Sequence, residues 1–398
     1  MSIHVDIKKN LGEYRLDIQF DAAARRIGIL GASGCGKTLT LKSIAGIFTP
    51  DEGRIAVGEK VFFDSREKIN IPPQKRHIGY LFQNYALFPN MTVEENLSIG
   101  LRYDGNAASS GRSAGRRKGR PAAVSEDSAA GNRSGGDGRG TAGSAAGHTR
   151  QDDPDARVRD IVRMLSLTGL EKLYPPQLSG GQQQRVALGR ILAYMPEAIL
   201  LDEPFSALDS YLRDRLQTEL FEILSDYPGT IIMVSHSRDE IYRFAEELVV
   251  IDGGRVIASG DTKAIFRNPE NKATARLTGC KNFSRAERKD AHTLYAADWG
   301  IHLTLRREIP EWIQHVGYRA HYFEPVYGER KENCIRFSLK SRADMPFEKN
   351  FYLRPEKEEF RPEDVITWFV QRDFWPVLEE KGLPDYLQFK EEGILFLR

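Results

Sequence analysis

A glycine-rich loop between an expected strand and an expected helix constrains this chain more than any other feature. The segment reads Gly31-Ala-Ser-Gly-Cys-Gly-Lys-Thr38 and fits the spacing G-x-x-x-x-G-K-[ST] of the phosphate-binding loop called Walker A. Residues 25–30 read as an apolar strand, and residues 37–47 have helical spacing, with Pro50 just beyond as a stop signal. This order of strand, loop and helix predicts an α/β fold around a phosphate site.

The loop is expected to bind phosphate with its backbone and two side chains. Glycines let N–H groups turn toward the phosphates, and the following helix adds the positive end of its dipole. Lys37 is expected to reach the β- and γ-phosphates, and the Thr38 hydroxyl to bind Mg²⁺. Cys35 has no adjacent catalytic partner, so we assign it no redox chemistry. The residues expected to contact nucleotide here are Gly31, Ser33, Gly34, Cys35, Gly36, Lys37, Thr38 and Leu39.

A second motif, Walker B, ends an apolar strand in two carboxylates. It reads Ile199-Leu-Leu-Asp-Glu-Pro204. Strand ends of this kind present side chains to a ligand crevice. Asp202 is expected to hold Mg²⁺ through the water shell of the metal, and Glu203 to polarise the attacking water as a general base. A surface turn that merely begins with two acids is the alternative, which the preceding Walker A loop disfavours.

The segment Leu178-Ser-Gly-Gly-Gln-Gln-Gln-Arg185 resembles one family of phosphate-loop proteins, the ABC ATPases. Its first residues fit the S-x-x-Q capping box of a helix start, and two glycines leave N–H groups bare. By this resemblance, the signature covers the γ-phosphate of ATP held by another subunit, so that two copies of the chain sandwich two nucleotides head to tail. The residues implied in this contact are Ser179, Gly180, Gly181 and Gln182.

The resemblance implies roles for four further residues. Gln83 matches the Q-loop, which touches Mg²⁺ and the water and joins the core to a helical subdomain. Asp209 matches the D-loop, and His236 matches the switch histidine that contacts the γ-phosphate. Tyr14 falls where the family places an aromatic ring that stacks on adenine, although a core position is the alternative for a tyrosine in a strand.

Two longer segments narrow the resemblance. Residues 72–97 resemble the ATPases of bacterial importers fed by solute-binding proteins, most of all those of the molybdate and sulfate type. Residues 316–323, Val-Gly-Tyr-Arg-Ala-His-Tyr-Phe, resemble a stretch of the β-barrel domain appended to such subunits. The implied fold is a P-loop ABC ATPase domain with a helical subdomain, followed by a small β-rich domain of the OB or TOBE kind.

The implied function is ATP hydrolysis, with Mg²⁺, coupled to uptake of an inorganic oxyanion such as molybdate, tungstate or sulfate. The implied partners are a second copy of the chain, transmembrane permease subunits and, indirectly, a solute-binding protein, at the cytoplasmic face of the cell membrane. Import of another solute, such as iron, a polyamine or a sugar, is the alternative. A soluble ABC ATPase without a transport role is a more distant one.

Composition divides the chain into two expected domains and an insertion. We expect the ATPase domain over 1–278 and an accessory domain of the TOBE or MOP kind over 279–398, where aromatic-rich segments alternate in polarity. The accessory domain is expected either to bind an oxyanion or a regulator, or to extend the dimer interface. Residues 104–152 contain 11 Gly, 10 Ala and 7 Ser, which predicts a disordered insertion. The alternatives for this insertion are an inert linker and a regulatory or anionic-lipid contact.

Charge, cysteine content and hydropathy argue against several classes of protein. Lys plus Arg is 57 and Asp plus Glu is 56, which argues against a nucleic-acid partner. The 3 cysteines are too few for a disulfide framework or a four-ligand zinc site, which fits a reducing cytoplasm. Residues 1–20 alternate in polarity and read as strands, not as a signal peptide. No run reaches the roughly 18 apolar residues that cross a bilayer, so a membrane role would need a partner.

Overall fold

The computed structural model describes residues 2–105, 154–206, 210–357, 361 and 364–398. Most of the predicted insertion 104–152, and the predicted D-loop residue Asp209, lie outside these residues. The chain forms two compact units, one of Met1–Asn84 with Pro196–Arg398 and one of Tyr85–Met195. No helix of the described ranges combines the length and the apolar character needed to span a membrane.

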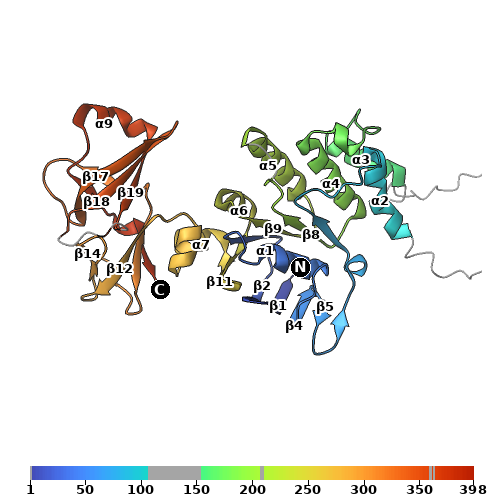
Figure 1. The fold of residues 1–398 in the computed structure, drawn as a ribbon, viewed down its shortest axis with the longest axis horizontal. Coiled ribbons are helices and arrows are strands. Elements are labelled where there is room, and N and C mark those ends of the chain that lie inside the picture. Colours follow the sequence, from blue (N-terminus) through green and yellow to red (C-terminus); the bar gives the residue numbers. More distant parts are fainter. Residues whose placement is uncertain (1, 106–153, 207–209, 358–360, 362–363) are drawn as a thin grey trace, which may run out of the picture. The chain divides into compact units, whose positions relative to one another are not determined.

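Among the described residues, eleven strands form the main sheet of the first unit, in the order β6-β5-β4-β1-β2-β11-β10-β3-β9-β8-β7 (Figure 1). The run from β10 to β7 is parallel, whereas β1, β2, β4, β5 and β6 pair antiparallel. The bounds are β1 Ile3–Leu11, β2 Tyr14–Ala22, β3 Arg26–Gly31, β4 Glu52–Val57, β5 Lys60–Asp64, β6 Ile69–Asn70, β7 Ile78–Leu81, β8 Ala198–Asp202, β9 Thr230–Ser235, β10 Glu247–Asp252 and β11 Arg255–Asp261.

The residue patterns explain these two kinds of strand. Every residue of β8 and β9 is buried, as expected for parallel strands covered on both faces. In β1 the residues Ile3, Val5 and Ile7 are buried, while the residues between them face outward. Short apolar runs in the sequence predict strands at 25–30, 54–57, 78–82, 199–202, 230–234 and 248–251. All of them are present, with ends shifted by at most two residues.

Helix α1, Lys37–Ala45, follows the phosphate loop as predicted but ends two residues earlier. Gly36 and Gly46 flank it with φ of 104° and 79°, which only glycine adopts without strain. A buried arginine closes its C-terminal end: the Arg76 guanidinium, only 1% exposed, donates to the Ser43 and Ile44 carbonyls at 2.8 Å each. A cation at this end also complements the helix dipole.

The remaining helices of the first unit follow or cover its strands. Helix α5 precedes β9, and α6 follows β9 directly, packing on β3 and β9. Their bounds are α5 Ser210–Ser225, α6 Arg238–Phe244, α7 Thr262–Arg267, α8 Lys272–Leu277 and α9 Trp375–Lys381, with short 3-10 turns at Pro73–Lys75, Arg372–Phe374 and Glu391–Gly393.

The second unit is a helical layer that packs closely at one glycine. It contains α2 Val93–Gly105, α3 Pro154–Met164, a 3-10 turn Pro175–Gln177 and α4 Gly180–Tyr194. A Cβ on Gly189 of α4 would lie 2.6 Å from Leu97, 2.7 Å from Leu165 and 3.0 Å from Ile161, so the three helices meet at this position. Thr92 and Glu95 fit the T-x-x-E pattern that predicts a capping box at a helix start. The box is present, because each residue's backbone N–H donates to the other's side chain.

Two five-stranded sheets of the described residues follow α8. One has the order β14-β13-β12-β15-β21, with β12 Asn282–Arg288, β13 Thr293–Ala296, β14 Ile301–Thr304, β15 His315–Tyr318 and β21 Ile394–Leu397. The other has the order β16-β20-β17-β18-β19, with β16 Glu324–Val326, β17 Cys334–Asp344, β18 Glu348–Pro355, β19 Ile366–Gln371 and β20 Tyr386–Gln388.

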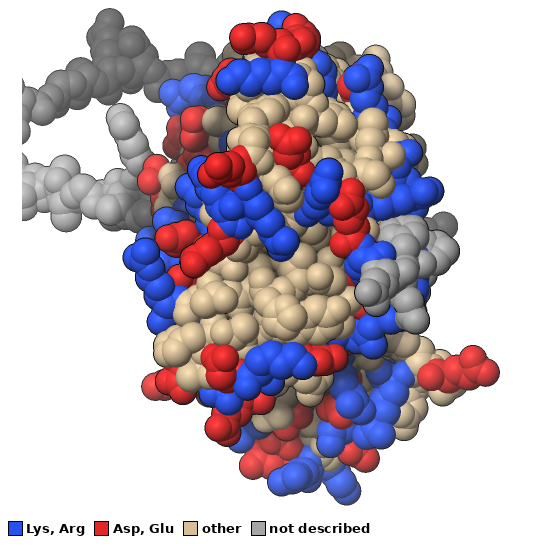
Figure 2. Space-filling model, turned by 90° about the vertical axis from the view of Figure 1, so that its left-hand side faces the viewer, with Lys and Arg blue, Asp and Glu red and all other residues tan. Residues whose placement is uncertain are grey.

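These sheets share a core of apolar residues in which Trp299, Trp368 and Phe389 are buried. The aromatic-rich sequence of this region predicts that its tryptophans, Trp312 included, are core residues. Trp312 is instead exposed, with the Arg398 guanidinium over its ring. On the face in Figure 2, positive and negative side chains are interspersed around uncharged surface.

The predicted domain boundary at 278/279 stays a prediction, because these sheets belong to the same compact unit as the main sheet.

Candidate functional site

The predicted loop and the two predicted carboxylates meet at one edge of the main sheet. Strand β9 lies between β3 and β8 and is parallel to both. Leu30 pairs with Ser235 across one side of β9, and Asp202 pairs with Val234 across the other. The carboxyl ends of parallel strands are the usual place for a ligand crevice. The sheet order therefore joins segments that are about 170 and 200 residues apart in the sequence.

In the phosphate loop, Lys37 folds back over the backbone. Its ammonium donates to the carbonyls of Gly31 and Ala32 at 2.9 Å each. Residues Ser33 and Gly34 are exposed at the tip, while Cys35 and Gly36 are buried below it, and Leu39 packs partly on the core. Burial raises the pKa of the Cys35 thiol, which keeps it protonated and fits the absence of an assigned reaction.

Asp202 is held by two hydroxyl groups. The Thr38 hydroxyl donates to Oδ1 at 2.8 Å, and the Tyr80 hydroxyl donates to Oδ2 at 2.8 Å. Burial, together with the nearby carboxylate, raises the pKa of Tyr80, so its phenol stays a donor. Tyr80 was not among the residues predicted from the sequence, although it is the only residue with a polar side chain in the otherwise apolar strand β7. It lies 122 residues from Asp202 in the chain.

Glu203 turns sharply after β8 and reaches His236. Its φ is 46°, a left-handed conformation that is uncommon for a residue other than glycine and that recurs at functional sites. The Glu203 N–H donates to the Val234 carbonyl at 3.0 Å, and its Oε2 lies 3.3 Å from Nδ1 of His236. His236 is exposed and Glu203 is half-buried, so both side chains are open to a ligand.

A buried carboxyl supports the segment that carries His236. Glu240 accepts hydrogen bonds from Ser235 on one side of His236 and from Gln217 of α5 at 3.0 Å. Ser235 in turn accepts from the backbone N–H of Ser237 at 2.9 Å. Burial raises the pKa of the Glu240 carboxyl, and Glu203 adds to that rise, although Ser235, Arg213 and His236 act in the opposite direction. This network, too, was not among our sequence predictions.

Tyr14 lies beside the phosphate loop, with its hydroxyl turned inward. A Cβ on Gly36 would lie 2.8 Å from that oxygen and one on Gly254 would lie 3.2 Å from it. The hydroxyl has no hydrogen-bond partner among the described residues, and burial raises the pKa of Tyr14. The ring packs partly on the main core. Its expected contact with adenine stays a prediction.

The remaining predicted residues occupy two places. Gln83 is exposed, two residues after the end of β7. The signature residues belong to the second unit, where Ser179 is the N-cap of α4 and its hydroxyl accepts from the Gln182 N–H. Ser179 and Gly180 are exposed and Gly181 is buried. This confirms the predicted helix start, and it leaves the first turn of α4 open to solvent on the side of Ser179 and Gly180.

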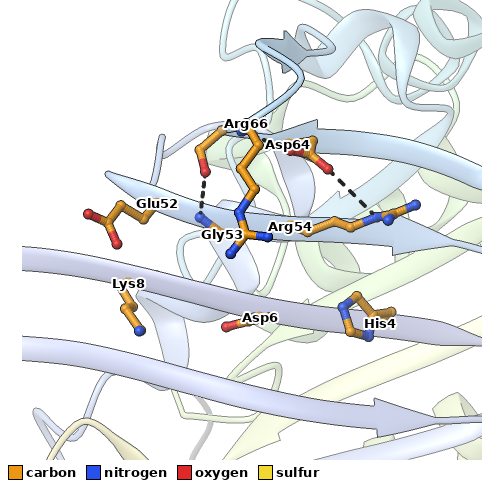
Figure 3. Close-up of a pocket in the computed structure, with 9 residues that line it drawn as sticks. His4, Asp6, Lys8, Glu52, Gly53, Arg54, Asp64 and Arg66 are labelled. Atoms are coloured by element: carbon orange, nitrogen blue, oxygen red, sulfur yellow. Dashed lines mark hydrogen bonds and ion pairs between the residues drawn. The ribbon is translucent and has the colours of Figure 1, made fainter.

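A polar concavity of about 360 Å³ lies elsewhere, on the outward face of β1 and β4 (Figure 3). Its lining balances Lys8, Arg54 and Arg66 against three acids, so it has no charge preference. Asp64 accepts from the backbone N–H groups of Arg66 and of the next residue, which lowers the pKa of the Asp64 carboxyl and marks it as a turn cap. None of the predicted site residues lines this concavity.

The residues around Asp202 fit a magnesium site. A carboxylate and a hydroxyl oxygen, from Asp202 and Thr38, stand 2.8 Å apart, and oxygen donors of this kind are the ligands Mg²⁺ prefers. No group of three His, Cys, Asp or Glu side chains able to hold a metal occurs in the part of the chain that the structure describes. Two protein ligands match a metal that is bound together with nucleotide phosphates, not in a dedicated cage.

Known proteins resemble this chain over most of its length. The ABC transporter family model matches residues 16–206. The sulfate/thiosulfate import ATP-binding protein of Chromobacterium violaceum is 37% identical over 71% of this chain and 63% of its own length. The Fe(3+) ions import ATP-binding protein of Haemophilus influenzae is 35% identical over 63% of this chain and 59% of its own length. The chain thus spans less than two thirds of both of these relatives.

A longer match extends into the C-terminal sheets. The molybdenum import ATP-binding protein of Photobacterium profundum is 32% identical over an alignment of 351 residues that covers 85% of this chain and 84% of that protein. The match includes most of the residues that follow the main sheet. Together with the Walker A loop at the sheet edge, this coverage identifies the chain as a member of the ABC transporter family of ATP-binding proteins.

Proposed function

We propose that this chain binds ATP with Mg²⁺ and hydrolyses it as the ATPase subunit of an ABC importer. The observation that carries the proposal is the arrangement at one sheet edge, where Asp202 contacts Thr38 at 2.8 Å and Glu203 lies 3.3 Å from His236. These are the metal, base and γ-phosphate groups that phosphoryl transfer to water requires. The family membership of the chain supports the same function.

Each residue has a distinct role in this proposal. Lys37 leaves its two loop carbonyls to bind the β- and γ-phosphates, and loop N–H groups orient them. Thr38 and Asp202 hold Mg²⁺, which when bound neutralises the charge that develops on the phosphates. Glu203 accepts a hydrogen bond from the attacking water as general base, and His236 keeps the Glu203 carboxylate in place and contacts the γ-phosphate. Gln83 and Asp209 are proposed to complete the site around the water.

A single change tests the assigned base. Glu203→Gln removes the basic group and keeps the shape, so we expect kcat for ATP to fall by about 10² to 10⁴. ATP affinity should stay within a few-fold. Glu222→Gln, on an exposed part of α5, is the matched control and should leave kcat unchanged. A Glu203→Gln protein that hydrolyses ATP at the normal rate would exclude this residue as the base.

We further propose that two copies act head to tail, with Ser179 of one copy covering the ATP bound by Lys37 of the other. The exposed, capped start of α4 supports this, because a bare helix end with glycines is suited to an anion. Mixing Lys37→Ala chains with Ser179→Phe chains tests it. Each variant alone should be inactive, while random mixing restores one site in half of the dimers, or about a quarter of normal activity. Absence of any recovery would argue against a shared site.

The proposal also extends to the solute that the importer transports. We propose uptake of an inorganic oxyanion, with permease subunits and a solute-binding protein as partners at the cytoplasmic face of the membrane. The relative that matches both the main sheet and the C-terminal sheets is named for molybdenum import, which supports this choice. Relatives named for Fe(3+) and for spermidine/putrescine match over shorter stretches, so those solutes are the alternative.

The solute proposal is tested with the complete transporter in vesicles. ATP hydrolysis should rise when the binding protein is supplied with molybdate, tungstate or sulfate. It should not rise with Fe³⁺ or spermidine. The opposite pattern would assign the chain to another importer and leave the ATPase proposal intact.

A further inference from the structure

Tyr80 and Thr38 hold the same carboxylate from different kinds of position. Thr38 belongs to the first turn of α1, next to the phosphate loop, and its hydroxyl is itself an expected metal ligand. Tyr80 belongs to the main sheet, where β7 pairs in parallel with β8. Its side chain is 9% exposed, and its ring lies 4.5 Å from that of Phe82. Packing therefore fixes the Tyr80 hydroxyl more firmly than the Thr38 hydroxyl.

The two hydroxyl groups have different roles once metal and nucleotide bind. The Thr38 hydroxyl can ligate Mg²⁺ through an oxygen lone pair while its proton still points to Oδ1 of Asp202, so it belongs to the metal site itself. The Tyr80 hydroxyl contacts the other oxygen, Oδ2, at 2.8 Å and is not one of the proposed metal ligands. It can keep its hydrogen bond while Oδ1 turns toward the water shell of the metal.

We propose that Tyr80 is a positioning residue for the magnesium site: its hydroxyl holds one oxygen of Asp202 so that the other faces the metal. The inference rests on the proposed nucleotide function and adds a residue that the family motifs do not include. Asp202 is only 5% exposed, so loss of the Tyr80 hydroxyl leaves a buried carboxylate oxygen without this donor. Residues that orient a metal ligand typically change metal affinity by about 10- to 100-fold when they are removed.

The test is Tyr80→Phe, which keeps the ring and removes only the hydroxyl. ADP binding to the full-length chain is measured by calorimetry with Mg²⁺ and with EDTA, so that the readout is affinity and not turnover. We expect the gain in ADP affinity that Mg²⁺ provides to fall by about tenfold, while the affinity in EDTA is unchanged. Tyr227→Phe is the matched control, since its buried hydroxyl donates to the Pro196 carbonyl, away from Asp202. It should leave both affinities unchanged.

A double-mutant cycle checks that Tyr80 acts through Asp202. In an Asp202→Asn background, Tyr80→Phe should change the effect of Mg²⁺ by less than twofold. A tenfold effect that persists in this background would overturn the proposal, and so would a normal effect of Mg²⁺ in the single variant. An equal loss of affinity with Mg²⁺ and with EDTA would mean that Tyr80 only supports the fold. Failure of the unaltered chain to bind ADP at all would instead overturn the proposed function, and this inference with it.

Discussion

Arg76→Met tests whether a buried guanidinium holds the helix that carries the side chains proposed to bind nucleotide. Arg76 donates to the carbonyls of Ser43 and Ile44 at the end of α1 and, through Nε, to the Ile71 carbonyl at 2.7 Å. Methionine keeps an apolar stem of similar length but leaves the Ile44 and Ile71 carbonyls without a donor, while the Ser43 carbonyl keeps the hydrogen bond from the Gly46 N–H at 3.1 Å. The structure predicts that α1 becomes less stable without any change in the phosphate loop itself.

The magnitude follows from those bonds. An unsatisfied buried carbonyl costs about 1 to 3 kcal/mol, so two of them cost at least about 2 kcal/mol. Keeping the guanidinium charged in this place has a cost of its own, because burial lowers the pKa of Arg76 to about 10, and its removal offsets part of the loss. We therefore take the lower figure, about 2 kcal/mol, which corresponds to a rise of about 30-fold in the opening equilibrium of the helix.

Amide hydrogen exchange is the assay, since it reports local opening of a helix inside a larger chain. Amides of residues 40–45 should exchange about 30-fold faster in Arg76→Met, and MgATP should bind more weakly because Lys37 and Thr38 start the same helix. Arg54→Met is the control, since the Arg54 side chain is half exposed and its ion pair with Asp64 is 3.9 Å long. Exchange in α1 that changes less than threefold would refute the reasoning that Arg76 caps this helix.

Two further predictions follow from buried positions. Burial raises the pKa of the Glu240 carboxyl in the folded chain. At pH values between the ordinary pKa and the raised pKa, the folded chain therefore binds more protons than the unfolded chain. The free energy of unfolding should fall as pH rises through that range. Glu240→Gln should lack this fall, and melting temperatures at pH 5 and pH 7 measure it; identical pH slopes would contradict the shift. Gly189→Ala should destabilise the second unit by about 1 to 2 kcal/mol, because the new methyl overlaps three side chains while helix propensity returns about 1 kcal/mol. Limited proteolysis of that unit would detect the change, and unaltered resistance would mean that the three helices move apart at no cost.

The parts of the site whose local structure is set by a few consecutive residues were predictable from the sequence. The spacing of glycines before Lys37, the apolar strand before Asp202 and the capping box at Ser179 each need only a few consecutive residues, and the structure has the predicted strand or helix at each place. Local rules suffice there because turns, strand ends and helix caps are decided within about one helical turn. Trp312 shows the limit of local rules, because it lies in the turn before β15 and is exposed, although the aromatic-rich sequence around it predicts a core residue.

The contacts that tune the site depended on the order of the strands. Nothing in residues 78–81 says that this strand lies beside β8, yet that pairing brings the Tyr80 hydroxyl to Asp202. Likewise, Gln217 reaches Glu240 across 23 residues only because α5 and α6 pack against each other, with the ring centroids of Phe221 and Phe244 5.3 Å apart. The sequence by itself determined the chemical groups and the loop that binds phosphate. Only the tertiary structure decided which buried side chains hold those groups, because such contacts follow from strand pairing and helix packing between distant segments.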